Sequence, residues 1–384
     1  MNPMNSRAGK TQPQRAGYLA FVPAPLNPPP AIEVDAEMLS LASQASSALG
    51  LLSGISHYLP HSREALAMYA IKEAIWSSRI EGIACTIEDS LLRKATRATL
   101  RSTDTDIEAV ASCTAAARQG IQMTRKLPLS LRLLRETHAI LMQGAHGAGK
   151  TPGEFRRSQN WIGSRGCDLA SASFVPPPAA EMTAALADLE LFMQARETFP
   201  PVIQCAIVHA QFETIHPFLD GNGRLGRILV SLFLHEHEVL AHPTLYLSRF
   251  LAQNRREYYD HLSAVREHGA WEDWIKFFLR GLTSTAEHAT QTATKLIALD
   301  VNLVIRALKA NKNETALIDR LFKAPIFDIR TAAQWLGLSY VTVASALQRL
   351  EQDGLVSEMT GKRRNKLFRF SAFLDVFETT EEGG

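Results

Sequence analysis

One short glycine-rich stretch constrains the fold of this chain more than any other part of its sequence. Residues 216–227 read His-Pro-Phe-Leu-Asp-Gly-Asn-Gly-Arg-Leu-Gly-Arg, between two segments with helical apolar spacing. The Asp220-Gly221 and Asn222-Gly223 pairs predict tight turns, because glycine adopts positive φ without steric cost. The stretch therefore predicts a compact turn that delivers the chain to a helix over 224–238.

This turn has the chemistry of a phosphate site. Free N–H groups and the positive end of the helix dipole bind phosphate at a helix N-terminus. Arg224 and Arg227 are three residues apart, so they share a helix face and form a cationic clamp. Asp220 supplies a hard oxygen ligand that suits Mg²⁺. His216 is the natural general base, since its ordinary pKa is about 6.5, and Pro217 is expected to hold it in an extended conformation.

Each of these residues alone has a plainer interpretation. His216 alone would be a structural histidine with satisfied hydrogen bonds, and the glycines alone would be an ordinary loop. The combination of histidine, carboxylate, glycine turn and paired arginines favours a catalytic phosphate site.

The whole stretch resembles the signature of the Fic family, His-Pro-Phe-x-Asp/Glu-Gly-Asn-Gly-Arg-x-x-Arg, without departure. The resemblance implies that His216 deprotonates a target hydroxyl and that Asp220 holds Mg²⁺. It also implies that AMP moves from ATP to a Ser, Thr or Tyr hydroxyl of a protein, by in-line attack on the α-phosphorus with release of pyrophosphate. The implied ATP-binding residues of the motif are Gly221, Asn222, Gly223, Arg224, Leu225, Gly226 and Arg227, with Arg224 on the phosphates and Arg227 at the γ-phosphate.

A second segment resembles the inhibitory motif of Fic proteins, Ser/Thr-x-x-x-Glu-Gly/Asn. It reads Ser-Ser-Arg-Ile-Glu-Gly over 77–82 and follows an alanine-rich helical pattern over 63–79. Ser77 and Glu81 are four residues apart and share a helix face. A carboxylate near the C-terminus of a helix opposes the helix dipole, so Glu81 is expected to have a cationic partner. The resemblance names that partner as Arg227; the alternative is a solvent-facing glutamate.

Two further regions resemble parts of the Fic core. Residues 153–156, 160–163 and 174–177 resemble the region of the Fic flap, where 159–163 and 172–175 are expected to form a hairpin. The resemblance implies that this hairpin aligns a target segment by strand addition. Tyr258 and Tyr259 resemble positions near the adenine, although ordinary helix packing by aromatic residues explains them nearly as well.

Residues 313–375 are expected to form a winged-helix domain. Its recognition helix is placed at 341–352, and its wing at 355–369 carries the basic residues Lys362, Arg363, Arg364, Lys366 and Arg369. Contact with the DNA backbone and contact with protein, including dimerisation, remain equal alternatives.

The predicted fold class is mainly α, with a Fic helical core, a β-hairpin flap and the winged-helix domain. The expected order is an extended N-terminal arm (1–35), a helical region with the inhibitory helix (36–125), the catalytic core (126–285), a linker helix (286–312) and the winged helix (313–375). The Gly-Ala-His-Gly-Ala-Gly-Lys-Thr run at 144–151 matches the Walker A letters. It is rejected as a P-loop, because a helix precedes it and Pro152-Gly153 follows.

Composition narrows the class of protein. The formal net charge is +2, so the chain as a whole is not built to hold nucleic acid by charge. Its four cysteines are scattered, which argues against a disulfide framework or zinc cage. No signal peptide is evident and no apolar run is expected to reach membrane-spanning length, so we expect a cytoplasmic protein without a membrane partner.

The sequence thus predicts a protein adenylyltransferase that uses ATP and Mg²⁺ and is inhibited by its own Glu81. Its expected partner is a protein with a hydroxyl side chain, and the chain itself is one candidate; a homodimer and DNA remain open. One alternative is a DNA-binding regulator with an ATP-sensing Fic core. Another is a Fic enzyme that removes AMP or transfers a different phosphate-linked group.

Overall fold

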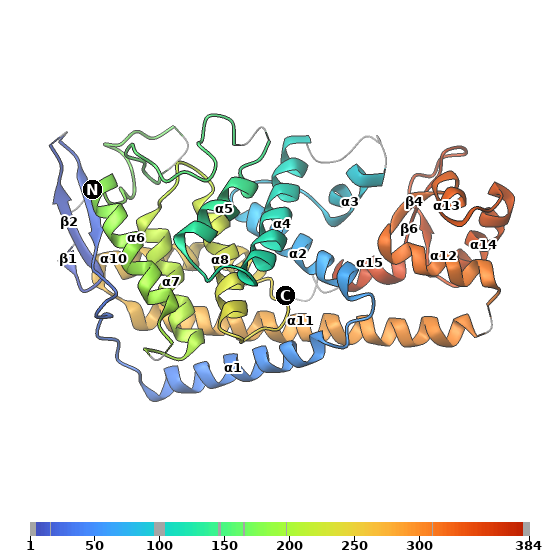
Figure 1. Cartoon of the computed structure of the whole chain (residues 1–384), viewed down its shortest axis with the longest axis horizontal. Helices are drawn as coiled ribbons and strands as arrows, with labels where there is room; N and C mark the ends of the chain where they lie inside the picture. Colours follow the sequence, from blue (N-terminus) through green and yellow to red (C-terminus); the bar gives the residue numbers. More distant parts are fainter. Residues whose placement is uncertain are drawn as a thin grey trace.

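A helix of 37 residues, α11 (Trp271–Ala307), runs along one side of the molecule beside the N-terminal helix α1 (Ala36–Ser56), as Figure 1 shows. The structure is a computed structural model that describes residues 5–15, 17–95, 104–144, 147–163, 166–196, 198–308 and 310–378. Asp35 caps α1 by accepting a hydrogen bond from the Met38 N–H at 2.7 Å. Lys276 of α11 lies 2.6 Å from Asp35 and 2.7 Å from Glu37, which fixes the start of α1 against α11.

Helix α1 corrects one expectation from the sequence. It is long and apolar enough to cross a membrane by length and composition, with a mean hydropathy of 1.2 over its best 18 residues. The expectation that no apolar run approaches that length was wrong. After Glu37, helix α1 contains no charged residue, and its small Ala, Ser and Gly residues were not counted as part of an apolar run. In the structure its buried residues pack along α11.

The helices that position the site surround α7 (Pro201–Ile215), which is buried at every position from Val202 onward and therefore lies at the centre of the core. Helix α8 (Asn222–Glu236) packs on α7, and α2 (Ser62–Ile80) packs on α4 and α9. The remaining core helices are α3 (Ile87–Ala95), α4 (Asp104–Thr124), α5 (Leu131–Leu141), α6 (Ala179–Gln194), α9 (Ser248–Gln253) and α10 (Arg255–His268). The mainly helical fold class is confirmed.

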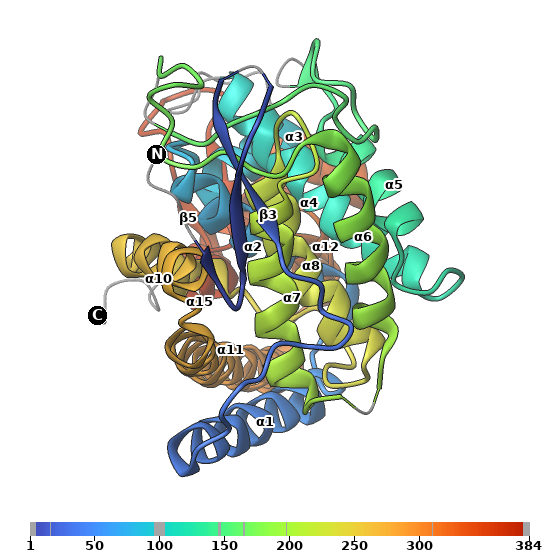
Figure 2. The same ribbon diagram turned by 90° about the vertical axis from the view of Figure 1, so that its left-hand side faces the viewer.

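The N-terminal arm forms a sheet that the sequence did not reveal. Strands β1 (Asn5–Ser6), β2 (Gly9–Pro13) and β3 (Leu19–Pro23) pair antiparallel in that order. Figure 2 shows β3 crossing in front of α7, and the Phe21 N–H donates to the Val175 carbonyl of the flap region at 2.9 Å. The expected arm at 1–35 is thus a sheet that docks on the core; residues 1–4 and 16 lie outside the described part.

The flap region is less regular than the expected hairpin. Its ladder is a single antiparallel bridge between Ile162 and Phe174, within the two predicted strands. Their backbone groups exchange hydrogen bonds of 2.8 and 3.1 Å. Side chains supply further contacts between the two segments, because the Gln159 amide donates to the Pro176 carbonyl at 2.9 Å and the Ser173 hydroxyl donates to the Ile162 carbonyl at 2.8 Å. Residues 164 and 165, between the predicted strands, lie outside the described part.

The C-terminal unit begins with α12 (Lys312–Lys323), β4 (Ile326–Asp328) and α13 (Ile329–Leu336). It continues with α14 (Tyr340–Gln352), β5 (Ser357–Glu358), β6 (Leu367–Arg369) and α15 (Ser371–Glu378). The strands pair in the order β4-β6-β5, and Asp328 and Ser339 cap α13 and α14. The helix predicted at 341–352 corresponds to α14, and the predicted wing at 355–369 contains β5 and β6.

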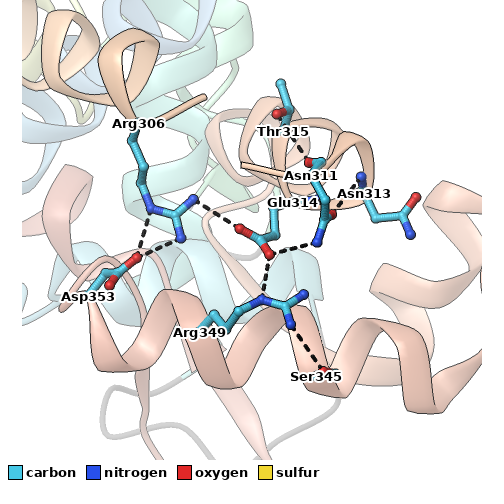
Figure 3. Close-up of polar contacts among 8 residues, drawn as sticks. All are labelled: Arg306, Asn311, Asn313, Glu314, Thr315, Ser345, Arg349 and Asp353. Carbon is cyan, nitrogen blue, oxygen red and sulfur yellow. Dashed lines mark hydrogen bonds and ion pairs between the residues drawn. The ribbon is translucent and has the colours of Figure 1, made fainter. Parts of the chain in front are cut away.

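A polar cluster joins the end of α11 to this unit (Figure 3). Arg306 of α11 donates to Asp353 at 2.6 Å and lies 3.4 Å from Glu314, which also pairs with Arg349 at 2.5 Å. The carboxylate of Glu314 is buried, so this pairing resists solvent screening better than a surface ion pair. The separate linker helix expected at 286–312 is instead the second half of α11, which runs unbroken to Ala307.

Candidate active site

The signature stretch forms the connection between α7 and α8. His216 has φ 49° and ψ 60°, a left-handed conformation, and Gly221 has φ 76°. His216 is therefore not extended as predicted, because its N–H still donates to the Phe212 carbonyl at 3.0 Å and ends α7 as a left-handed cap. Helix α8 begins at Asn222, two residues earlier than expected, which places Gly223 inside its first turn.

Arg156 holds His216 in this uncommon conformation. Its Nε donates to the His216 carbonyl at 3.0 Å, and the Arg156 N–H donates to the Pro217 carbonyl at 2.9 Å. The Asn160 amide also donates to the His216 carbonyl, at 3.2 Å. A left-handed residue other than glycine costs about 1–2 kcal/mol, so these contacts offset local strain. Arg156 is a site residue that the sequence reasoning did not single out.

The imidazole of His216 is prepared to accept a proton. Its Nδ1 lies 3.3 Å from the Glu213 carbonyl, which fixes the hydrogen on Nδ1 and leaves the lone pair on Nε2. Burial lowers the pKa of His216 to about 4. The ring is therefore neutral at pH 7, as a general base requires.

The turn before α8 is braced by Asn222. Its side chain accepts from the Phe218 N–H and donates to the Phe218 carbonyl, both at 2.8 Å. The His138 ring stacks on Phe218 with centroids 3.7 Å apart, and its Nε2 lies 3.0 Å from the Asp220 carbonyl. Burial lowers the pKa of His138 to about 4, so this bracing ring is also neutral. His138 was missed from the sequence, where it is one of several polar residues on an amphipathic helix.

Glycine is needed at the most crowded positions of the phosphate-binding turn, which we call the nest (residues 220–226). A Cβ at Gly223 would lie 3.0 Å from both the Arg227 guanidinium and the Glu81 carboxylate, and one at Gly221 would lie 2.7 Å from the Met142 sulfur. Gly226 packs against Glu213, and the Leu225 side chain is buried with its N–H bonded to Gly221. Leu225 therefore has neither a free N–H nor an exposed side chain for the predicted phosphate contact.

The two arginines of the clamp meet Glu81. The Glu81 Oε2 lies 2.8 Å from the Arg224 Nε, and the Arg227 Nη2 donates to Oε1 at 2.8 Å. Ser77 accepts twice from Arg227, through Oγ at 2.8 Å and through its carbonyl at 2.9 Å. The side chains of Arg224 and Arg227 are 3% and 2% exposed. The Arg227 contact is a charge-assisted hydrogen bond, whereas the Arg224 contact is an ion pair in which Nε is not aligned for a hydrogen bond. The expected contact between Glu81 and Arg227 is present, and Arg224 joins it.

Two buried carboxylates, Glu73 and Glu213, lie near the clamp, and neither was predicted from the sequence. Burial raises the pKa of Glu73 and of Glu213 to about 7 in each case. Glu73 accepts hydrogen bonds from the Ser248 N–H at 3.1 Å and from the Ser248 hydroxyl. Glu73 thus ties α2 to α9.

The two tyrosines have different surroundings. Tyr258 is buried and its hydroxyl lies 2.9 Å from the His209 Nε2, so it belongs to the core. Tyr259 is 41% exposed and lines a cavity of about 330 Å³ between the flap region and α10. The other lining residues are Ile162, Gly163, Ser173, Phe174, Arg255, Ser263, Arg266 and Glu267. Only Tyr259 is therefore placed to meet a ligand directly.

Asp220 lies on the solvent-exposed side of the phosphate-binding turn, just before Gly221. Its carboxylate accepts from the Gly221 N–H at 2.6 Å and lies 3.7 Å from the Arg224 Nη2. Its side chain is 43% exposed, in contrast to the buried arginines. In the described part of the chain no cluster of His, Cys, Asp and Glu could hold a metal ion by protein ligands alone. A cation at Asp220 would need further oxygen ligands from a substrate.

Two family models match the parts of the chain that form this site. Residues 128–234 match the model of the Fic/DOC family, and residues 39–122 match the model of the Fic/DOC family N-terminal region. Residues 39–234 therefore contain a Fic/DOC domain and its N-terminal region, and these matches include the signature stretch at 216–227 and the segment at 77–82.

Two similar relatives are proteins named protein adenylyltransferase Fic. The one from Aedes aegypti is 32% identical over 127 residues, which are 33% of this chain and 22% of the relative. The one from Culex quinquefasciatus is 29% identical over 151 residues, which are 39% of this chain and 27% of the relative. The chain thus spans about a quarter of the length of these relatives.

Solved structures show the same fold. A Fic family protein from Desulfovibrio desulfuricans G20 superposes with a TM-score of 0.56 at 19% identity, over 88% of this chain and 97% of that one. Fic-1 from C. elegans superposes with a TM-score of 0.51 at 19% identity, over 68% of this chain and 74% of that one.

Proposed function

We propose that this protein transfers AMP from ATP to a hydroxyl group of a protein side chain. The observation that carries the proposal is the convergence of a neutral His216, the N-terminus of α8 and the Arg224–Arg227 clamp within one connection between helices. The relatives named as adenylyltransferases support the reaction class.

The roles follow from the chemistry of each group. The His216 Nε2 would take the proton of the target hydroxyl as its oxygen attacks the α-phosphorus, and the bond to the β-phosphate oxygen breaks to release pyrophosphate. The first-turn N–H groups of α8 and Arg224 would stabilise charge on the phosphate oxygens. Most of the rate gain would come from positioning, because the reacting groups need only be held in line.

The residues present fit Mg²⁺. One half-exposed carboxylate beside a phosphate nest suits an ion that is shared between protein and substrate phosphates, and Asp220 would be its protein ligand. When bound, Mg²⁺ would neutralise charge on the leaving phosphates.

In the described conformation Glu81 acts as a brake in this proposal. Arg227 donates through its Nε and Nη2 to Ser77 and Glu81, so these donors are not available to a γ-phosphate. ATP would bind with its phosphates in an unproductive position until Glu81 leaves. The cavity lined by Tyr259 and the flap region would take the nucleoside.

The test is labelling of the protein by ATP that carries the label at either the α- or the γ-phosphate, in Mg²⁺. The expected result is label from the α-position only, stronger in Glu81→Gly than in the wild type. Label from the γ-position would instead define a kinase. Loss of label on incubation with pyrophosphate or with the metal alone would favour the alternative in which the site also removes AMP.

DNA binding by the C-terminal unit is a second candidate. Lys362, Arg363, Arg364 and Lys366 are exposed on the connection between β5 and β6. Arg369, the fifth basic residue of the predicted wing, is not available for DNA, because it pairs with Asp375 and Glu378 at 2.8 Å each. Fluorescence anisotropy with duplex DNA would test this candidate, and binding should weaken steeply with salt. No salt-sensitive binding at low ionic strength would reject it.

A further inference from the structure

The helix that carries the brake is held from its opposite side by the last helix of the chain. Ser77 and Glu81 of α2 contact α8, whereas Tyr69 and Lys72 contact α11 and α15. The Tyr69 hydroxyl donates to the Ala289 carbonyl of α11 at 2.9 Å. The two sets of contacts lie on one continuous helix, about 14 Å apart between Lys72 and Glu81 at 1.5 Å per residue.

Lys72 is the central contact with α15. It is fully buried, and its ammonium donates to the Phe377 carbonyl at 2.6 Å while lying 4.9 Å from the Tyr246 ring centroid. Phe377 is in the last turn of α15, where carbonyls have no partner within the helix. The negative end of the helix dipole also favours a cation there. A buried ammonium that lost this carbonyl would be strongly destabilised, so α2 and α15 hold one another.

Aromatic packing extends this contact into the C-terminal unit. The Phe377 ring meets Tyr69 edge to face, with centroids 5.6 Å apart. Phe377 also packs on Phe373 at 5.5 Å, and Phe373 packs on Phe322 of α12 at 5.2 Å. A movement of α12 therefore reaches the buried face of α2 through rings in direct contact.

Ion pairs fix α15 to the rest of its unit. Arg369 of β6 pairs with Asp375 and Glu378 of α15, and it also lies 3.2 Å from Glu88 of α3. The Ala372 N–H donates to the Leu355 carbonyl at 3.2 Å. These contacts make α15 a part of the C-terminal unit that reaches back onto the core.

We propose that α15 is a latch that holds α2 in its inhibitory position through Lys72 and Phe377. Displacement of the C-terminal unit would withdraw the Phe377 carbonyl from Lys72, loosen α2, and let Glu81 leave Arg227. Lys72 is then a positioning residue for the brake and touches no substrate. The inference rests on the proposed role of Glu81, but its structural half can be measured without any activity.

The test compares Lys72→Met and Phe377→Ala with Phe368→Ala in the full chain. Phe368→Ala is the matched control, because Phe368 is buried in β6 and stacks on Phe327 within the C-terminal unit. Amide hydrogen exchange is followed at residues 78–83, where Glu81, Gly82 and Ile83 donate to carbonyls of the last turn of α2. We expect exchange there to be about tenfold faster in both latch variants and unchanged in the control.

The labelling assay supplies the second readout. Each latch variant should raise self-labelling by at least about threefold, with no further rise in a Glu81→Gly background, since the brake is already absent. Faster exchange without labelling in any variant would support the latch and count against AMP transfer. Unchanged exchange in both variants would overturn the latch, whatever the labelling shows. If the Phe377→Ala variant unfolds, Phe377→Leu replaces it. We expect a smaller increase in the amide exchange rate at residues 78–83, and an unchanged rate would again overturn the proposal.

Discussion

Glu81 lies between Arg224 and Arg227, with one carboxylate oxygen 2.8 Å from each guanidinium group. The arginines are buried, and the carboxylate arrives from a different helix, the end of α2. In the proposed function the phosphates of ATP would need these two guanidinium groups, and the γ-phosphate would need Arg227. Inhibition in this account is therefore a competition between two anions for one pair of cations.

Removal of Glu81 should make the protein less stable and more responsive to ATP. In Glu81→Gly both buried guanidinium groups lose a partner, which should cost about 2 kcal/mol, less than for a fully buried pair because the Glu81 side chain is 27% exposed. Thermal unfolding with and without Mg²⁺-ATP measures this, and the rise in Tm on adding ATP should exceed that of the wild type. An equal rise would contradict the competition.

Gly226 should not tolerate alanine. A Cβ there would lie 2.4 Å from the Glu213 carboxylate and 3.1 Å from the Phe212 ring, so Gly226→Ala should destabilise by about 1–3 kcal/mol despite the better helix propensity of alanine. Gly54→Ala is the control, because its Cβ would meet nothing within 4 Å in the helix α1. It should stabilise by about 0.5–1 kcal/mol. Urea unfolding measures both, and equal signs would refute the prediction.

Glu73 should make stability depend on pH in a predictable direction. Its pKa is raised from 4.5 to about 7, so the folded state holds its proton over a range where the unfolded state has lost it. The stabilisation is complete below pH 4.5 and is lost as the pH rises to about 7. Relative to wild type, Glu73→Gln should therefore gain stability across this window, by up to about 3 kcal/mol for 2.5 pKa units. Chemical unfolding at several pH values measures the difference, which should stay constant above pH 7.

Arg156 should matter for catalysis more than for ATP binding. It orients the His216 carbonyl, and its guanidinium also donates to the Pro177 carbonyl at 2.5 Å. Arg156→Lys keeps the charge, but a lysine ammonium cannot reproduce the planar set of donors that the guanidinium aims at both carbonyls. His216 should therefore lose its position, and the labelling rate should fall by about tenfold or more. The apparent KM for ATP should change little, since Arg156 lies outside the α8 nest. A rise in KM at an unchanged maximal rate would show that Arg156 acts on binding instead.

The sequence was most informative where local chemistry dictates local structure. Short-range rules account for the glycine turn before α8 and for the shared face of Arg224 and Arg227. They also account for the helix predicted at 341–352, which is α14. The pairing of Glu81 with Arg227 was reached only through the family resemblance, because the residues are 146 positions apart.

The remainder depends on tertiary contacts that no short-range rule reports. Strand β3 is recognisable only beside its partners in β2 and the flap region. The left-handed conformation of His216 depends on Arg156, which is distant in sequence. Lys72 and Glu73 read as an exposed charged pair on a helix, yet both are buried because α15 and α9 cover them from opposite sides.

In the proposed function His216 acts as the base at a site that Glu81 closes. The most direct measurement compares Glu81→Gly with Glu81→Gly/His216→Ala, by the rate of labelling from α-labelled ATP and by the affinity for Mg²⁺-ATP. We expect the double variant to bind ATP as the single variant does, while its labelling rate falls by about 10²–10⁴. Equal labelling rates in the two proteins would show that His216 is not the base.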